Sequence, residues 1–357
     1  MFIKYLSLKD FRNFKTKKVE FPEKITVILG DNATGKSNIL EALHLLSTGK
    51  SFKARVEREM VNYGKDIARV EGVVRLPNST STKLEIVLTK GEINLHGGGV
   101  QKTQKKKLLV NGVAKRMIDF VGVIKTVLFG PWDLDLVTES PSIRRQFLDT
   151  VLSQVDREYR RSAMIYEKGL RQRNKLLSRI RDEGVSKSQL MYWDKLLIKH
   201  GEYLTIKRGE FIDYANATPD FLDREYSLVY DNSVISEGRL SQYEEEEIAA
   251  ATTLVGPHRD DFRFNINSDN GKIVDLSSFG SRGEQRMGVL WLKLAELSYI
   301  EKTTGDKPVL LLDDIFSELD HEHRGTVMGV CGKQQTIITT ADPHYVEKIK
   351  GAEIVEI

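Results

Sequence analysis

The sequence has few of the residues that would suit it to an oxidising compartment or a membrane. Cys331 is the single cysteine among 357 residues. One cysteine excludes an internal disulfide framework and a cysteine-based zinc site, and it fits a reducing cytosol. No apolar run is long enough to cross a bilayer, and residues 1–7 lack the charged, apolar and cleavage regions of a signal peptide. We therefore expect a cytoplasmic protein.

The chain also lacks a strong excess of either charge. Its 54 Lys and Arg residues nearly balance its 51 Asp and Glu residues, so the net charge is +3. That total does not indicate a nucleic-acid partner. The local distribution of charge is more informative, because two segments are rich in cations and residues 244–247 form an acidic run. Each run by itself is as typical of a solvated face as of a binding surface. The cations are Lys102, Lys105, Lys106 and Lys107, and Arg157, Arg160, Arg161, Arg171, Arg173, Arg179 and Arg181.

A glycine-containing loop at residues 30–37 is the most informative motif. It matches G-x-x-x-x-G-K-[ST], follows the apolar, β-branched run 25–29 and precedes the helix-forming run 38–46. In this context the glycines wrap a phosphate, and the helix N-terminus offers unpaired N–H groups. We expect Lys36 to reach the β- and γ-phosphates of ATP and the Ser37 hydroxyl to bind Mg²⁺. The predicted nucleotide contacts are Gly30, Asp31, Asn32, Ala33, Thr34, Gly35, Lys36, Ser37 and Asn38.

A second apolar strand, at residues 308–312, ends in two carboxylates, Asp313 and Asp314. Asp313 is in the position where Walker B acids hold Mg²⁺, and Asp314 is expected to orient or activate the attacking water. A buried strand followed by an acidic helix cap would give the same pattern. The phosphate-binding loop upstream favours catalysis, so we predict Lys36, Asp313 and Asp314 as the catalytic residues.

A third motif, at residues 276–286, is a small-residue turn that leads into a helix-forming run. Such a turn is another anion-binding geometry. It is useful to an ATPase if two copies face each other head to tail, because the turn of one chain then closes over the γ-phosphate held by the other. We predict that Ser281, Gly283 and Glu284 make these contacts and that ATP drives formation of a homodimer.

The periodicity of apolar residues divides the chain into three segments. Residues 1–142 alternate short strands and helices and include a hairpin signal at Asn111-Gly112. Residues 143–249 carry two amphipathic helical runs separated near Gly184. Residues 250–357 return to an α/β pattern, with an alternating strand at 262–266. We expect one ATPase head built from both ends of the chain and interrupted by an inserted helical arm domain.

These motifs together resemble those of ABC-type ATPase heads, and more narrowly those of the RecF family of bacterial DNA repair proteins. The ABC resemblance rests on the phosphate-binding loop, the 281–285 turn, the two carboxylates and residues 317–320, which are similar to a D-loop. The RecF resemblance covers almost the whole chain. It implies an α/β fold, with a Rad50-like P-loop head that contains a mixed sheet and with a short helical arm. The segments that it adds are 11–14, 129–137, 144–149 and 255–261.

The resemblance also implies a function. RecF-like proteins bind ATP with Mg²⁺, dimerise, and hydrolyse ATP slowly when DNA is present. They recognise duplex DNA next to single-stranded gaps, and with RecO and RecR they help load RecA in recombinational repair and replication restart. The resemblance thus implies gapped duplex DNA, a second copy of the chain, RecO and RecR as direct partners, RecA as an indirect one, no membrane partner, and a place at the nucleoid.

Several positions depart from the related patterns. Ala33 stands where family members often carry Gly, and Arg282 and Glu284 replace the Gly and Gln of transporter signatures. Asp314 replaces the usual Glu, and Thr340 stands at the position of the transporters' switch histidine. The shorter reach of Asp314 is consistent with slow turnover.

Binding of DNA by this chain would depend on cations that meet phosphates. The sequence shows no zinc-finger spacing, basic zipper or aromatic RNA-binding run, so recognition would follow backbone and junction shape. The alternative function is an ABC-type ATPase subunit that drives a membrane or other protein partner. An SMC-like structural protein would need far longer heptads than segment 143–249 holds, and a fused nuclease would need a further carboxylate metal site.

Overall fold

A computed structural model gives the fold. It describes residues 1–76, 80–94, 99–218, 225–267, 272–318, 321–344, 349 and 351–357. The chain forms two compact units, Met1–Asp133 with Ile300–Ile357, and Leu134–Tyr299. We call these the first and the second unit and describe each by itself. Their bounds differ from the three predicted segments, because residues 134–142 and 250–299 make their contacts within the second unit. The division of the chain into head and arm by function stays a prediction.

The first unit contains a parallel sheet in the order β10-β14-β15-β3-β16. Four of its strands, β3, β10, β14 and β15, are short and almost fully buried, as expected of a sheet covered on both faces, whereas the edge strand β16 is mostly exposed. The carboxyl ends of parallel strands meet at one edge, and ligands bind at that edge in open α/β sheets. The strands are β3 (Ile25–Leu29), β10 (Thr126–Phe129), β14 (Val309–Asp313), β15 (Thr336–Thr340) and β16 (Glu353–Glu356).

The first unit also contains an antiparallel sheet in the order β2-β1-β4-β5-β8-β9. Buried and exposed residues alternate along its strands, since one face packs on the core and the other meets solvent. The predicted turn at Asn111-Gly112 joins β8 to β9, which confirms the hairpin. The strands are β1 (Phe2–Phe11), β2 (Phe14–Glu20), β4 (Ile67–Arg75), β5 (Ser81–Thr89), β8 (Lys106–Val110) and β9 (Val113–Lys115).

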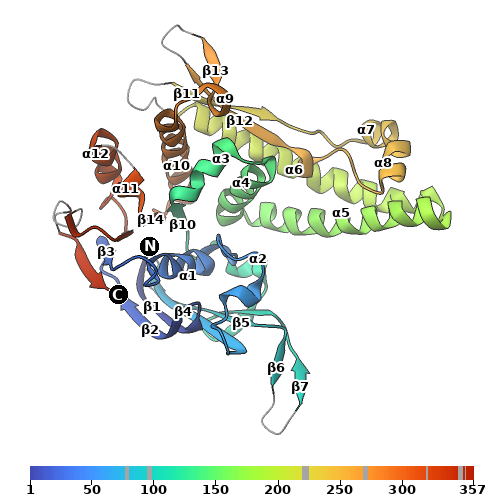
Figure 1. Ribbon diagram of the computed structural model, residues 1–357. Coiled ribbons are helices and arrows are strands. Elements are labelled where there is room, and N and C mark those ends of the chain that lie inside the picture. Colours follow the sequence, from blue (N-terminus) through green and yellow to red (C-terminus); the bar gives the residue numbers. More distant parts are fainter. Residues whose placement is uncertain are drawn as a thin grey trace. The chain divides into compact units, whose positions relative to one another are not determined.

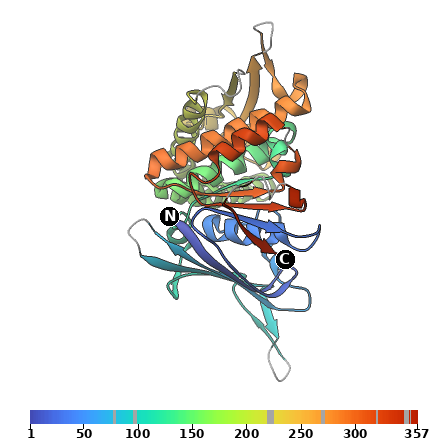
Figure 2. The same ribbon diagram turned by 90° about the vertical axis from the view of Figure 1, so that its left-hand side faces the viewer.

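Helix α1 (Lys36–Thr48) lies between these two sheets (Figures 1 and 2). Its side chains from Ile39 to Leu46 are buried in a single core with residues of both sheets. The helix that begins at the phosphate-binding loop is therefore fixed along its whole length. The first unit also holds the short elements η1 (Glu57–Met60), α2 (Met117–Phe120), η2 (Pro131–Leu134, shared with the second unit), α11 (Ile315–Glu318) and α12 (His321–Val330).

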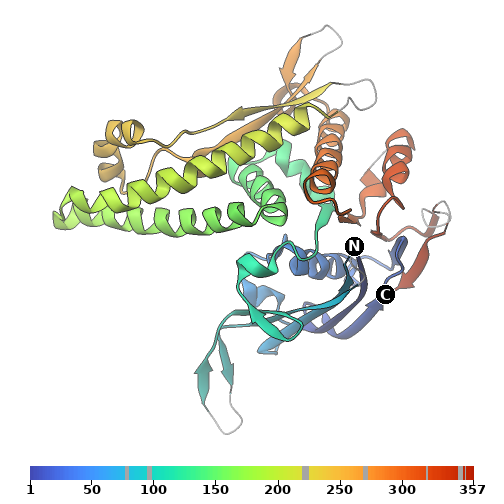
Figure 3. The same ribbon diagram turned by 180° about the vertical axis from the view of Figure 1, so that it is seen from behind.

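A two-stranded ribbon, β6 (Glu92–Asn94) and β7 (Val100–Lys102), extends from the ends of β5 and β8. The ribbon projects from the antiparallel sheet (Figures 1 and 3). The backbone continues the pairing between sheet and ribbon, because the Thr103 N–H donates to the Gly91 carbonyl at 2.9 Å. The predicted lysine cluster begins on β7 and ends on β8.

The second unit is built on a long antiparallel helical hairpin, α5 (Arg157–Glu183) and α6 (Leu190–Asn216), shown in Figure 3. Gly184 ends α5 in a left-handed conformation, with φ at 69°. The first predicted helical run is two helices, because Asp156 separates α4 (Pro141–Val155) from α5 and caps the latter by accepting from the Glu158 and Tyr159 N–H groups. The predicted separation of the helical runs near Gly184 is confirmed.

The rest of the second unit is a small sheet, β11-β12-β13, with short helices. The alternating strand predicted at 262–266 is β12, and it pairs within this sheet rather than with the parallel one. The remaining elements are α3 (Asp135–Thr138), η3 (Lys187–Gln189), β11 (Tyr226–Asp231), α7 (Glu237–Gln242), α8 (Glu244–Ala250), η4 (Pro257–Arg259), β12 (Asp261–Asn267), β13 (Ile273–Asp275), α9 (Leu276–Phe279) and α10 (Arg282–Thr304), whose last residues belong to the first unit.

Buried ion pairs hold the second unit together. Arg208 contacts Asp149 and Asp260, each at 2.8 Å, and Asp260 has no exposed side-chain surface. Arg173 contacts Glu247 at 2.6 Å, and both side chains are almost fully buried. The segment 255–261 and one member of the acidic run thus act in packing, since a buried charge needs a partner.

Within the described ranges, no helix is both long and apolar enough to span a membrane.

Candidate nucleotide-binding site

The loop at residues 30–37 joins β3 to α1 at the carboxyl edge of the parallel sheet, as predicted. Gly35 precedes the helix with φ at 114°, a conformation that favours glycine. The helix has no side-chain cap and no acidic residue in its first turn. Its first N–H groups are therefore not neutralised by a local carboxylate, which is the arrangement that an incoming phosphate requires.

Lys36 folds back over the loop. Its Nζ donates to the carbonyl oxygens of Gly30 at 2.7 Å and Asp31 at 2.8 Å. These contacts hold the amine at the mouth of the loop, where a phosphate would replace the carbonyls as its partner. The position agrees with the predicted contact to β- and γ-phosphates, and the contact itself stays a prediction.

Ser37 and Asp313 lie in direct contact. The Ser37 hydroxyl donates to Asp313 Oδ1 at 2.9 Å, and the Thr339 hydroxyl donates to the same oxygen at 2.5 Å. Residues from α1, β14 and β15 therefore meet at one point. A hydroxyl and one carboxylate are the hard oxygen donors that Mg²⁺ accepts when phosphates and water complete its shell, so the residues fit this ion. Thr339 was not predicted from the sequence.

Asp314 follows Asp313 in a left-handed conformation, with φ at 50°. Its N–H donates to the backbone oxygen and the hydroxyl of Thr339, each at 3.1 Å. A non-glycine residue held at positive φ is often found at functional sites. The neighbouring Thr340, expected at the switch position, is buried and its hydroxyl accepts from the Asp342 N–H at 3.1 Å.

The turn after β1 supports the phosphate-binding loop. The Asn13 amide donates to the Thr34 carbonyl at 2.7 Å and accepts from the Asn38 amide at 2.9 Å. A Cβ on Gly35 would lie 2.6 Å from the Phe14 ring and 2.7 Å from Asn13. The segment 11–14, which the sequence linked to a family, thus has a physical role as the outer wall of the loop.

Ala33 is the one departure within the loop, and its φ is 70°. A side chain in this region costs roughly 1–2 kcal/mol relative to glycine. The residue is exposed, so the cost is local.

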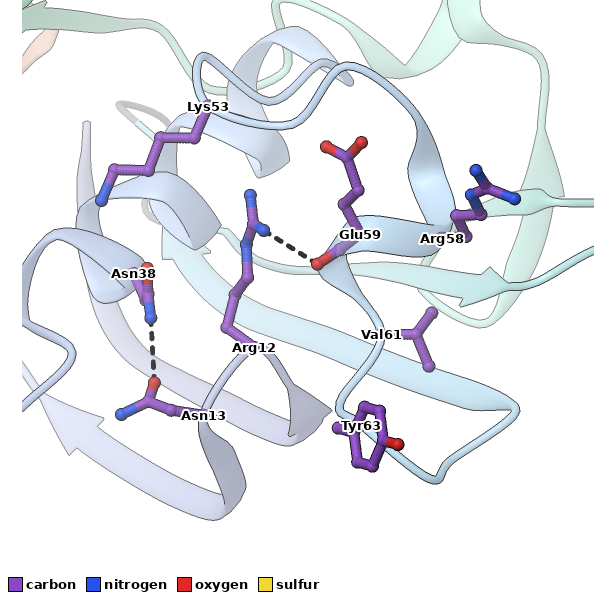
Figure 4. A pocket seen from close by; sticks show the side chains of 8 residues that line it. All are labelled: Arg12, Asn13, Asn38, Lys53, Arg58, Glu59, Val61 and Tyr63. Carbon is purple, nitrogen blue, oxygen red and sulfur yellow. Dashed lines mark hydrogen bonds between the residues drawn. The ribbon is translucent and has the colours of Figure 1, made fainter.

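A pocket of about 510 Å³ opens beside the loop (Figure 4). Cations line one part of it, and Figure 4 shows Arg12 between Lys53 and Glu59. The ring of Tyr63 is fully exposed. The lining residues are Arg12, Asn13, Asn38, Lys53, Arg58, Glu59, Val61 and Tyr63. Asn38 was predicted as a nucleotide contact, and Arg12 and Asn13 belong to the segment 11–14. The lining residues between 53 and 63 were not predicted, because no motif marks that part of the sequence.

Among the cations that line the pocket, Lys53 has a shifted pKa. Burial lowers the pKa of its amine, and the carboxylates of Asp313 and Glu41 act in the opposite direction. A partly desolvated amine near Asp313 favours an anionic ligand.

The turn at 281–284 lies in the second unit and starts α10. Ser281 and Glu284 form a complete capping box: the Ser281 N–H and hydroxyl both donate to Glu284 Oε2 at 2.8 Å, and the Glu284 N–H donates back at 3.3 Å. The Gln285 amide donates to the carbonyls of Leu276, Ser277 and Gly280, which stiffens the turn. The Glu284 carboxylate thus occupies the start of the helix.

One predicted segment, residues 317–320, is described only in part. Of the D-loop-like residues 317–320, the backbone of Ser317 and Glu318 is helical, while 319 and 320 lie outside the described residues. In segment 129–137, Asp133 accepts from the Gly130 N–H at 2.8 Å and forms a tight turn after β10.

The structure divides the predicted basic clusters. Lys102, Lys105 and Lys107 are exposed, whereas Lys106 donates to the Gly49 carbonyl at 2.9 Å and to Glu57 at 3.1 Å. Arg173 is buried in its pair with Glu247. Surface carboxylates pair with four further arginines of the cluster: Arg161, Arg171, Arg179 and Arg181.

Comparison with known proteins agrees with this geometry. The model of the RecF/RecN/SMC N terminal domain matches residues 2–357. A DNA replication and repair protein RecF from Herpetosiphon aurantiacus is 35% identical over 378 residues, which cover 98% of this chain and 97% of that protein. The chain belongs to the RecF family. Another member, from Bacillus thuringiensis, is 35% identical over 383 residues and covers 100% and 97% of the two chains.

Solved structures of RecF have the same fold. The recombination mediator protein RecF with ATP, described within the RecFOR pathway, is 32% identical, with a TM-score of 0.85, over 96% of this chain and 92% of that one. A second structure, RecF–ATPrS, gives a TM-score of 0.86 at 31% identity over 100% and 96% of the chains. The Smc head domain from Pyrococcus yayanosii, at 14% identity and a TM-score of 0.53 over 99% and 94%, shares the fold alone. The predicted ABC-type head is therefore confirmed.

Proposed function

We propose that this chain is an ATP-gated DNA-binding protein that acts with RecO and RecR to load RecA at single-stranded gaps. It binds ATP with Mg²⁺, dimerises, holds the duplex beside the gap and hydrolyses ATP slowly. The observation that carries the proposal is the meeting of Ser37, Asp313 and Thr339 beside the uncapped start of α1. Its RecF relatives are named for DNA replication and repair, and cytoplasmic work at the nucleoid follows from that function.

The chemistry of ATP follows from the loop and the strand ends. The N–H groups of residues 30–37 and the Lys36 amine bind the phosphates. Ser37 and Asp313 would hold Mg²⁺, which would supply positive charge beside the phosphates. Asp314 orients the attacking water. In the dimer, Ser281 and Gly283 of the second copy complete the site, with Glu284 beside them.

The pocket beside the loop is the place for the rest of the nucleotide. It begins at Asn13 and Asn38, which contact the loop and its helix, and reaches Val61 and the exposed ring of Tyr63. A flat apolar base can pack against such residues while its phosphates stay at the helix start.

The exposed lysines of the ribbon and β8 are the proposed DNA contacts in the first unit. The three lysines are all exposed: Lys102 on β7, Lys105 in the connection that follows it, and Lys107 on β8. Contacts of this kind bind phosphates without reading bases. Lys106 is not part of this surface, because its amine donates hydrogen bonds to Glu57 and to the Gly49 carbonyl.

The test is fluorescence anisotropy of a labelled gapped duplex, titrated with the protein in ATP-Mg²⁺, in ADP and without nucleotide. Tight binding that needs ATP and is lost in Lys36→Arg supports the proposal. Weak binding that ignores the nucleotide contradicts it, and it would favour an ATPase that serves a protein or membrane partner.

The salt dependence of the same titration locates the DNA surface. Replacing Lys102, Lys105 and Lys107 with Ala should reduce the slope of log K against log salt by about one for each phosphate that the protein no longer neutralises. Lys106→Ala serves as the comparison and should leave the slope unchanged. An unchanged slope in the triple variant would remove these lysines from the interface.

A further inference from the structure

Glu41 is a buried carboxylate that the chemistry proposed above does not use. It lies on α1, one turn after Ser37, and its side chain has no exposed surface. A buried carboxylate is stable only with a counter-charge and hydrogen bonds. Glu41 has both, and each leads to a different wall of the pocket beside the phosphate-binding loop.

The first partner is Arg12, on the turn after β1. Its guanidinium binds Glu41 with two hydrogen bonds, Nε to Oε2 at 2.8 Å and Nη2 to Oε1 at 2.6 Å. Its Nη1 donates to the Glu59 carbonyl at 2.8 Å. A bidentate pair of this kind fixes the plane of the guanidinium. The Arg12 side chain is still 19% exposed, so it presents an oriented cation to the pocket.

The second partner is Ser51, whose hydroxyl donates to Glu41 Oε1. The same hydroxyl accepts from the N–H groups of Lys53 at 2.9 Å and Ala54 at 2.7 Å. The carboxylate therefore also fixes the turn that carries Lys53. Within the same turn, the Phe52 ring stacks on the Trp132 ring, with 4.5 Å between the ring centroids.

We propose that Glu41 is the positioning residue of the nucleotide site: it holds Arg12 and the Lys53 turn at fixed places, so that both cations face a bound nucleotide. It does not touch the nucleotide itself. The proposal rests on the function proposed above. The anchor lies on the helix that begins at the phosphate-binding loop, so loop and cations are set by one rigid element.

Loss of the carboxylate should therefore weaken ATP binding more than turnover. Without Glu41, the two cations lose their common anchor, while Lys36, Asp313 and Asp314 keep their own partners. For Glu41→Gln, we expect the KM for ATP to rise about tenfold and kcat to change less than twofold.

The control must separate positioning from stability, because breaking any buried ion pair destabilises a protein. Glu247→Gln is a matched control: Glu247 is equally buried, it binds Arg173 at 2.6 Å, and it lies in the second unit. Both variants should lower the unfolding temperature. Only Glu41→Gln should raise the KM, and a KM that rises equally in both would overturn the proposal.

A double-mutant cycle tests whether Glu41 acts through Arg12. In the full-length Arg12→Gln variant, adding Glu41→Gln should raise the KM less than threefold further, because the shared step is already lost. Effects that multiply in full would contradict positioning through Arg12.

Ser51→Ala covers the case in which Glu41→Gln does not fold. It leaves the Arg12 pair intact and frees only the Lys53 turn, so the KM should rise two- to fivefold with little change in unfolding temperature. An unchanged KM would contradict the proposal that Glu41 positions Lys53 through Ser51. Binding of fluorescently labelled ATP to the natural chain is measured first: no binding there refutes the proposed function, whereas normal binding in Glu41→Gln refutes the positioning role alone.

Discussion

The two turns that the sequence predicts to bind anions begin their helices in opposite ways. The loop at 30–37 leaves the start of α1 without a side-chain cap, whereas the turn at 281–284 closes the start of α10 with its own carboxylate. An open helix start binds a phosphate directly, while a capped one is stable alone and must exchange a partner to bind. The difference fits the proposed roles, in which the first turn binds the nucleotide within one chain and the second makes its contact only with another copy.

Closing the open turn should give the largest effect. Gly35→Ala places a Cβ 2.6 Å from Phe14 at a φ of 114°, so we expect a loss of about 2–4 kcal/mol in stability and at least a tenfold weaker affinity for ATP. Gly184→Ala is the control, since its φ is also positive but nothing lies within 4 Å of the added atom. It should cost only about 1–2 kcal/mol and leave ATP binding intact. Chemical denaturation and nucleotide titration measure both.

Acid should act selectively on the unit that carries the capped turn. Burial lowers the pKa of His258 to about 4, so the folded state keeps this ring neutral while the unfolded state takes up a proton below its ordinary value of about 6.5. The free energy of unfolding should therefore fall by up to about 3 kcal/mol as the pH drops from about 6.5 to about 4, because of this histidine. Above about pH 7 the histidine should make no contribution to the pH dependence. His258→Gln should remove that part of the slope. Identical pH profiles for the two proteins would contradict the assignment.

Removing the charge from the capped turn should sharpen the comparison. A Gln at position 284 can keep the capping box but no longer repels a phosphate, so Glu284→Gln should strengthen ATP-dependent self-association two- to fivefold, at nearly unchanged stability. Analytical ultracentrifugation with ATP measures this, with Glu237→Gln in the first turn of α7 as a control. Weaker association would show that Glu284 contacts the nucleotide favourably, as the sequence alone predicted.

The smallest effect is expected inside the open turn itself. Ala33→Gly removes a side chain from a φ of 70°, a relief of about 1–2 kcal/mol that the greater freedom of glycine in the unfolded chain offsets by about 0.4–1 kcal/mol. We expect a net gain of about 0.5 kcal/mol, measured by thermal unfolding, with ATP affinity within twofold. A loss of stability would mean that Ala33 is not strained.

The sequence was sufficient where structure is local. The loop, its strand and its helix are contiguous, and the Asn111-Gly112 hairpin depends on two residues with positive φ. It was insufficient where distant residues meet. Nothing near Arg12 indicates Glu41, and nothing near Asp313 indicates Thr339, because these pairs depend on how the sheets pack. Periodicity also missed the break at Asp156. The apolar spacing continues through this residue, although its side chain caps a new helix.

The order of strands in the parallel sheet has a consequence for synthesis. Strand β3, which carries the phosphate-binding loop, lies between β15 and β16, so residues 25–29 pair with residues 336–340 and 353–356. A ribosome makes β3 early and both of its neighbours late. Until then the parallel sheet that positions the loop is incomplete, so a nascent chain has no nucleotide site. Strand β3, apolar except for Thr26, stays exposed to chaperones and to aggregation for most of translation.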